Sequence, residues 1–257
     1  MDAFTALRLQ TEWGADEALE AEPIDRLRPA PSRPAASEVR PAPVAAPGGA
    51  RVGLAERAAQ AAAGARTLDE LRAAIAGFEG IALRDTATNL VFAEGAAASG
   101  LLFIGEAPNA DADRAGSPFA GRIGAYLELM LRSIGLDRGN MMLAPLIPWR
   151  PPGDRPPSPS EIAACAPFLY RLIALVAPRW MVLLGTLPAR TLLGTAPMRR
   201  RGPPEWQKAG MPQTHTSIDT LTMPSPAVLL QTPSQRRETW AVLRLLRRSL
   251  DAQVTPM

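Results

Sequence analysis

The 257-residue chain has few of the side chains that most often carry catalytic or metal chemistry. It contains one cysteine, Cys165, and one histidine, His215. A single thiol cannot form an internal disulfide, and it cannot supply the three or four ligands of a zinc site or an iron–sulfur cluster. The sequence therefore excludes metal chemistry that depends on cysteine. It predicts no resident metal, no iron–sulfur cluster and no other cofactor.

Long hydrophobic runs are also missing. No segment approaches the ~18 to 20 uninterrupted apolar residues needed to cross a bilayer, and the first residues, MDAFTALRLQTEWG, have neither a basic nor an apolar signal region. Hydrophobic residues make up 47% of the chain and charged residues 21%, a balance typical of a globular protein. We therefore expect a cytoplasmic protein with no membrane contact.

Lysine is nearly absent, because Lys208 is the only one among 28 basic residues. Residues 1–100 carry 10 basic and 14 acidic side chains, whereas residues 101–257 carry 18 basic and 11 acidic ones, a net charge of +7. Guanidinium groups suit bidentate phosphate contacts. A sequence this rich in Ala, Arg, Pro and Gly is also typical of a GC-rich coding bias, so the arginine content alone does not identify a ligand.

The composition divides the chain into four parts. Residues 1–27 contain a short amphipathic helical pattern, and residues 28–50, rich in proline and alanine, predict a flexible linker because they cannot bury enough apolar surface to offset their ordering entropy. Residues 51–66 predict a helical extension. Thr67, with Glu70 three residues later, predicts a capped helix that docks on the main domain, which we place at 67–252.

The main domain alternates short apolar runs with helical patterns. Strands are expected at 101–106, 141–147, 180–185 and 217–223, and helices at 121–134, 158–176, 187–193 and 234–250. This alternation predicts a three-layer α/β/α fold with a short, mostly parallel central sheet. Ligands bind such sheets at the carboxyl ends of the strands, so the loops that begin at Gly105, Pro148, Gly185 and Pro224 are the candidate site.

Two of these loops carry side chains suited to binding a ligand. The loop of residues 105–127 places Glu106 at a strand end, is rich in glycine, and offers Phe119 as a flat face for stacking. The loop of residues 148–161 is braced by prolines and leads into a helix N-terminus. Arg150 and Arg155 in that loop are candidates for phosphate contacts, which the helix dipole would favour.

The motifs in these loops, in this order, resemble the uracil-DNA glycosylase superfamily and most closely its bacterial family 4 branch. The resemblance runs from about Leu68 to Leu250. It comprises GEAP (105–108), GSPFAGRIG (116–124), WRPPGDR (149–155), EIAACAPFL (161–169), VLLG (182–185), LLG (192–194), RRRG (199–202) and SPAVLLQTPSQRRETW (225–240).

The resemblance implies a DNA-repair enzyme that flips a uridine out of the stack and hydrolyses its N-glycosidic bond. Glu106 matches the acidic residue that positions the attacking water, and Phe119 matches the aromatic side chain that carries the base. Gly105, Ala107 and Pro108 match the backbone that borders the water and the base. DNA is the implied partner, and a monomer is expected.

Three polar positions depart from the family's pattern. The Asn that reads the uracil edge is replaced by Pro145, which has neither an amide donor nor a backbone N–H. The Asn of the R-P-P-x-N-R loop is Asp154, expected to be a solvated acid or a partner of Arg155. The His that stabilises the departing base is replaced by Ser225. Losing one preorganised donor typically lowers the rate ~10²- to 10³-fold.

Other positions have plainer interpretations. Ile81 and Trp149 stand near two expected cluster-cysteine positions, and Cys165 is expected to be a small buried hydrophobe. His215 lies ten residues before the position that the motif requires, which favours a structural or solvated role. Arg199, Arg200 and Arg201 are equally consistent with a phosphate-contacting stripe and with a solvated loop.

Two functions from different classes remain open. The first is a cluster-free DNA N-glycosylase whose activity is weakened or shifted to another base. The second is a non-catalytic DNA-binding or scaffold relative that kept the fold. Glu106 and Phe119 favour the first, and the three altered polar positions favour the second.

Overall fold

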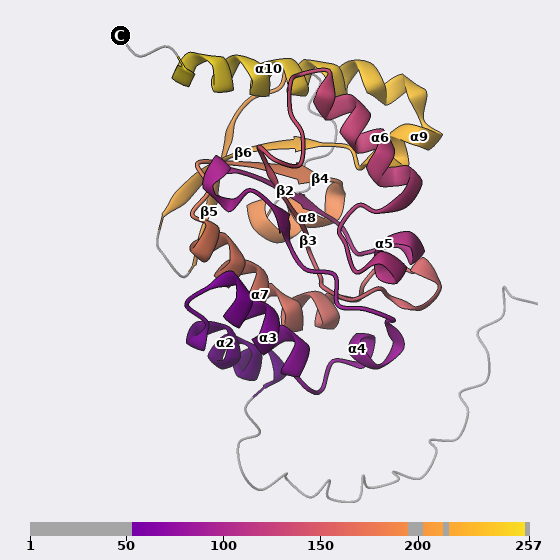
Figure 1. The fold of residues 1–257 in the computed structure, drawn as a ribbon, viewed down its shortest axis with the longest axis vertical. Helices are drawn as coiled ribbons and strands as arrows, with labels where there is room; N and C mark the ends of the chain where they lie inside the picture. Colours follow the sequence, from indigo (N-terminus) through magenta and orange to yellow (C-terminus); the bar gives the residue numbers. More distant parts are fainter. Residues whose placement is uncertain (1–52, 195–202, 213–215, 255–257) are drawn as a thin grey trace, which may run out of the picture. The chain divides into compact units, whose positions relative to one another are not determined.

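A computed structural model describes residues 53–194, 203–212 and 216–254 (Figure 1). The described residues all belong to one compact unit, residues 51–257. The predictions for residues 1–27 and 28–50 therefore lie outside the described residues.

The domain is built on a six-stranded sheet with the strand order β1-β3-β2-β4-β6-β5. The central strands β3, β2, β4 and β6 are parallel, and the two edge strands are antiparallel to their neighbours. All residues of β2 and β4 are buried, as expected for strands covered on both faces. The strands are β1 (Glu94–Gly95), β2 (Leu101–Gly105), β3 (Met142–Pro145), β4 (Trp180–Leu184), β5 (Gln207–Gly210) and β6 (Ser217–Met223).

Helices cover both faces of the sheet, which confirms the predicted three-layer fold (Figure 1). Alternate residues of β2 divide the core, since Leu102 and Ile104 face one layer and Leu101 and Phe103 face the other. The first layer contains α2 (Leu54–Gly64), α3 (Leu68–Gly77), α4 (Ala82–Thr86), α7 (Pro159–Val176) and α8 (Thr186–Leu193), and the second contains α6 (Gly121–Arg132), α9 (Pro226–Gln231) and α10 (Arg236–Val254). Short 3-10 turns occupy Ala97–Ser99, Pro152–Asp154 and Pro233–Gln235.

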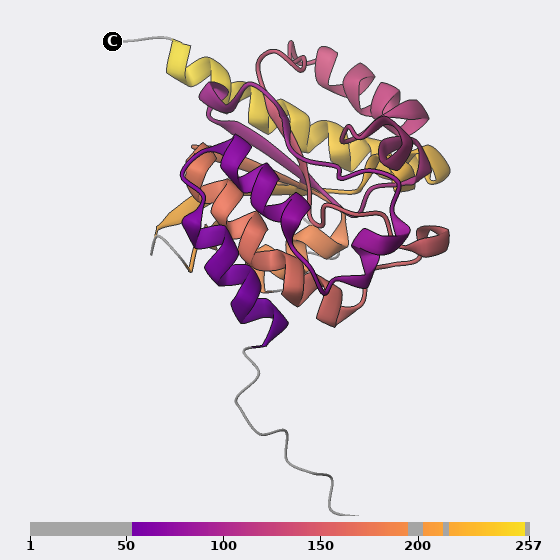
Figure 2. The same cartoon turned by 60° about the horizontal axis from the view of Figure 1, so that its bottom comes forward.

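The helical extension predicted for 51–66 contains α2, which packs on α7 (Figure 2). Ala58 and Ala62 of α2 are fully buried in the same core as α3 and α7. Thr67 caps α3 by accepting from the Glu70 amide, whereas the Glu70 carboxylate accepts from the amide of Arg66. The α2–α3 pair therefore shares one core with the rest of the domain, with no packing boundary at residue 67.

Helix α7 is the core helix of the first layer. By length and composition alone it could cross a membrane, but its buried face, which includes Phe168 and Leu172, packs in the core. It begins at a capping box in which Ser158 and Glu161 bond to each other's backbone amides. The Arg155 guanidinium and these Ser158 contacts lower the pKa of Glu161 to about 2.

Candidate active site

A cavity of about 140 Å³ lies at the carboxyl ends of the parallel strands. Residues at or just beyond the ends of all four strands line it, which agrees with the rule for open parallel sheets. Its volume suits a small planar group, since pockets for drug-sized ligands are roughly 300 to 1,000 Å³. The lining residues include Val91, Glu106, Ala107, Pro108, Asn109, Ala112, Pro118, Phe119, Ile123, Pro145, Leu184, Ser225, Pro226 and Ala227.

Glu106 brings a partly buried carboxylate to this cavity from the end of β2. Burial raises the pKa of Glu106, and the backbone amides of Leu187 and Thr186 at the start of α8 oppose that shift. The Leu187 amide donates to Glu106 Oε1 at 3.4 Å. Gly185 permits this approach, because its φ is +109° and a β-carbon there would lie 2.6 Å from Glu106 Oε1.

Phe119 lines the cavity from a strained backbone position. Its φ is +55°, in the left-handed region that costs an L residue roughly 1 to 2 kcal/mol. The Arg138 guanidinium holds the segment by donating to the carbonyls of Pro118 and Phe119 at 3.3 and 3.2 Å. The phenyl ring lies so close to Gly105 that a β-carbon at Gly105 would collide with it. Strain maintained by surrounding contacts is typical of functional sites.

The two replaced base-reading positions also lie at this cavity. Pro145 ends β3 and contributes only apolar surface. Ser225 is 7% exposed and is the N-cap of α9, where its hydroxyl oxygen accepts from the Val228 amide at 3.4 Å. Because that contact uses a lone pair, the Ser225 hydroxyl hydrogen is free to donate into the cavity.

Asn109 is a polar cavity residue that the sequence argument missed. Its Oδ1 accepts from the Ala112 amide at 2.9 Å and caps α5 (Ala110–Ala115), which fixes the orientation of the side-chain amide. The two N–H groups of Nδ2 then remain as donors on a residue that lines the cavity. An Asn followed by a short helical segment is an N-cap signal, and that pattern could have identified it.

Asp113 on α5 ties a neighbouring loop to the site. It is 2% exposed, and its Oδ1 accepts from the amides of Thr88 and Asn89 at 2.9 and 3.0 Å. The Asn89 side chain in turn donates to the Asp113 carbonyl at 2.7 Å. This loop leads directly to Val91, which lines the cavity.

The predicted phosphate-contacting arginines do not line this cavity. Arg150 donates to Asp154 at 2.7 Å, and Arg155 forms a two-pronged ion pair with Glu161 at 2.9 and 2.6 Å. Of the two expectations for Asp154, the pairing with Arg155 is wrong, because Arg155 is engaged by Glu161 and Asp154 accepts from Arg150. The expectation of a solvated acid agrees with its half-exposed side chain. Arg199, Arg200, Arg201 and His215 lie outside the described residues.

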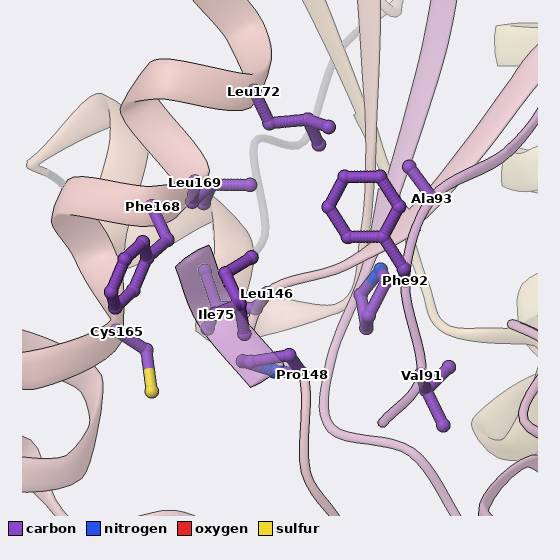
Figure 3. A pocket seen from close by; sticks show the side chains of 11 residues that line it. Ile75, Val91, Phe92, Ala93, Leu146, Pro148, Cys165, Phe168, Leu169 and Leu172 are labelled. Atoms are coloured by element: carbon purple, nitrogen blue, oxygen red, sulfur yellow. The ribbon is translucent and has the colours of Figure 1, made fainter. Parts of the chain in front are cut away.

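A second cavity of about 20 Å³ lies beside α7 and is almost entirely apolar (Figure 3). In Figure 3, Leu169 and Leu172 of α7 point toward Phe92, whereas Phe168 lies beside Cys165. Cys165 also lines it, and burial raises the pKa of its thiol to about 12.

The positions where the family places cluster ligands do not fit an iron–sulfur cluster in this chain. Ile81 and Trp149 are 3% and 2% exposed and belong to the same apolar core as Cys165. No three His, Cys, Asp or Glu side chains within the described part of the chain are grouped to bind a metal. Cys165 and Trp149 are thus residues of the apolar core.

The fold and the cavity together define a class of protein. Its members are three-layer α/β domains with a small pocket at the carboxyl ends of the strands, beside a partly buried carboxylate. Comparison with known families narrows this class. Residues 92–247, more than half of the chain, match the family described as the uracil DNA glycosylase superfamily. The chain belongs to this superfamily.

Similar proteins include three curated type-4 uracil-DNA glycosylases. The chain is 37% identical to that of Pyrobaculum aerophilum over 105 residues, 38% to that of Archaeoglobus fulgidus over 108, and 39% to that of Thermotoga maritima over 98. These matches cover 41%, 42% and 38% of this chain and 54%, 54% and 51% of the relatives. The chain therefore spans about half the length of the curated relatives it matches.

Proposed function

We propose that the protein is a DNA N-glycosylase that releases uracil or another damaged base from a flipped nucleotide. The observation that carries the proposal is that Glu106 and Phe119 line one cavity of ring size, in a chain of the uracil DNA glycosylase superfamily. The names of the relatives support uracil as the first base to test. DNA is the proposed partner, and we propose a cytoplasmic monomer.

The proposed reaction requires opposite charges on its two sides. As the N-glycosidic bond breaks, the sugar becomes cationic and the base becomes anionic. Ionised Glu106 orients a water that attacks C1′ and favours the cationic sugar. The oxygen of that water ends on C1′, and the departing base takes up a proton. Phe119 offers its ring to the flipped base, and the donors of Ser225 and Asn109 face the developing negative charge.

Base selectivity is expected to be weak. Pro145 gives no hydrogen bond to the pyrimidine edge, whereas a site that hydrogen-bonds its substrate discriminates strongly against analogues that lack the group. Asn109 supplies donors elsewhere in the cavity lining, through the amide left free by its capping contact. We therefore expect uracil to be one of several bases released.

A non-catalytic DNA-binding relative is the alternative. Two observations favour it: Pro145 contributes no donor, and both Arg150 and Arg155 are neutralised by ion pairs. A protein of this type would keep the cavity as a remnant of the fold and bind DNA without releasing a base.

The deciding experiment is a base-release assay of the full-length protein on oligonucleotides that contain uracil, hypoxanthine, xanthine or an ethenobase, in single-stranded and duplex form. We expect release of at least one base by the wild type and loss of that release in Glu106→Ala. Arg72→Glu, an exposed substitution on α3, is the matched control. Binding to DNA without release of any of the four bases would favour the non-catalytic alternative.

A further inference from the structure

The exposed face of α10 carries a line of arginines, and Glu238, beside the first of them, is the exposed acid of the first turn. Arg237, Arg244 and Arg248 are exposed and have no ion-pair or hydrogen-bond partner among the residues that the structure describes. Trp240 lies between them in the sequence and is 43% exposed, one of three exposed large hydrophobic side chains in the described part of the chain. We call these four residues the α10 stripe.

Helical spacing places the α10 stripe on one side of the helix. Offsets of 3, 7 and 11 residues from Arg237 return to nearly the same direction at 3.6 residues per turn. The opposite side, with Val242, Leu243 and Leu246, is buried against the sheet. Asp251 near the end of the helix is paired with Arg247 at 2.5 Å, so it does not neutralise the stripe.

The stripe begins at the edge of the candidate active site. Arg236, at the start of α10, donates to the Leu229 carbonyl of α9 at 3.4 Å, and its guanidinium lies 5.8 Å from the Tyr126 ring of α6. The first residues of α9 line the cavity. From there α10 runs across the domain toward the C-terminus (Figure 1).

We propose that the α10 stripe binds a single strand of DNA that flanks the nucleotide in the cavity. Unpaired arginines contact phosphates, and an exposed tryptophan between them stacks on an unpaired base, the combination that single-strand binding surfaces use. The stripe is about 16 Å long at 1.5 Å per residue, long enough to contact several successive nucleotides of one strand. A duplex would leave Trp240 without a base to stack on, because its bases already stack on one another.

This inference rests on the proposed function in taking DNA as the ligand, and its test is kept separate from base release. The full-length protein is titrated into a fluorescent oligothymidine that contains no uracil, and anisotropy is measured at several salt concentrations. Arg244→Glu should weaken binding about fivefold or more and reduce the slope of log K against log salt by about 0.7. Arg72→Glu on α3, in the other helical layer, is the matched charge reversal and should change binding less than twofold, as about expected for remote surface charge.

Trp240→Ala provides a second, charge-independent readout. It should weaken oligothymidine binding and abolish the quenching of tryptophan fluorescence that stacking causes, while leaving the salt slope unchanged. The proposal is wrong if Arg244→Glu and Arg72→Glu weaken binding equally, or if duplex of the same sequence binds more tightly than the single strand. It is also wrong if Arg244→Glu changes only the oligomeric state, which would assign the stripe to a second copy of the chain.

Base release by the same variants separates the two proposals. If the wild type releases no base yet binds oligothymidine through the stripe, the proposed function fails and this inference stands. If the wild type releases base while Arg244→Glu binds oligothymidine normally, this inference fails and the proposed function stands.

Discussion

Glu106 is subject to two opposing influences. Burial disfavours its charged form, and the amides at the start of α8 favour it, with burial the larger effect. Its pKa is therefore raised above the ordinary value, while the carboxylate stays fixed in place. A carboxylate that positions a water is useful only when it is ionised, so the same environment sets the lower pH limit of the proposed reaction.

Base release should fall as the pH drops through the pKa of Glu106, which burial raises above the value of a free glutamate. Glu106→Gln should remove this acid limb and lower the rate by about 10²-fold or more. The folded state binds the Glu106 proton more tightly than the unfolded state does. At a pH above the raised pKa, the ionised carboxylate therefore lowers the free energy of unfolding, and Glu106→Gln should not lower the melting temperature at neutral pH. Rates and melting curves across pH measure both effects. A pH-independent rate would contradict the assignment.

Asn109 performs two tasks that can be separated by substitution. Asn109→Ser keeps a good N-cap for α5 but removes both amide donors, whereas Asn109→Ala removes the cap as well. We expect both variants to release uracil more slowly, and only Asn109→Ala to lose about 1 kcal/mol of stability. Equal rates for Asn109→Ser and wild type would show that the amide does not contact the base.

The residues that line the cavity could be predicted from the sequence more fully than the hydrogen-bond and ion-pair partners of the site residues. Glu106, Phe119, Pro145 and Ser225 could be placed at one site because strand ends and ordered motifs define it. The sequence did not single out Asn109, whose capping bond leaves the amide Nδ2 available to the cavity. The partner of Asp154 depended on which arginine the loop turned toward, and local sequence does not fix that choice. The roles of the cavity residues remain predictions.

At the scale of elements, α5 connects the cavity with the loop before β1. Asp113 is the link, since one buried carboxylate oxygen satisfies two backbone amides of that loop. Removing the Asp113 carboxylate breaks two part-buried hydrogen bonds from backbone amides to a charged group. Each such bond contributes about 1 to 3 kcal/mol.

Asp113→Ala should therefore lower the free energy of unfolding by about 2 to 4 kcal/mol. It should also slow base release, because the loop carries Val91 into the cavity. Asp113→Asn keeps an oxygen acceptor at the same place and should cost clearly less. Denaturant unfolding of the three proteins is the measurement, and equal stabilities of Asp113→Ala and Asp113→Asn would show that the contact to the loop is unimportant.

The central elements were predictable because each has a clear period and a clear boundary. Helix α7 spans Pro159–Val176, within one residue of the predicted helix at 158–176, and the four parallel strands are the four apolar runs. The short elements α5, α9 and β5 were not predicted. With four to six residues each they have no measurable period, and packing at the sheet edge and around the cavity determines their conformation.

At the scale of the whole molecule, the two helical layers differ in chemistry. The layer of α6, α9 and α10 borders the cavity and carries the α10 stripe. The layer of α2, α3 and α7 is an apolar core that includes Ile81, Trp149 and Cys165. This core needs no metal to hold it, because large side chains fill the space and their burial supplies the stabilisation.

We therefore expect the purified protein to contain no stoichiometric iron and to lack the visible absorption of an iron–sulfur cluster. Cys165→Ala should leave metal content and base release unchanged and lower stability only slightly, because it removes one sulfur atom from an apolar site beside a small cavity. Cys165→Ser should lower stability more, since it would bury a polar hydroxyl in an apolar site. This account would be contradicted if iron co-purified with the wild type and were lost from Cys165→Ala. The Cys165 thiol, whose pKa is raised to about 12, would then have to bind iron as a thiolate.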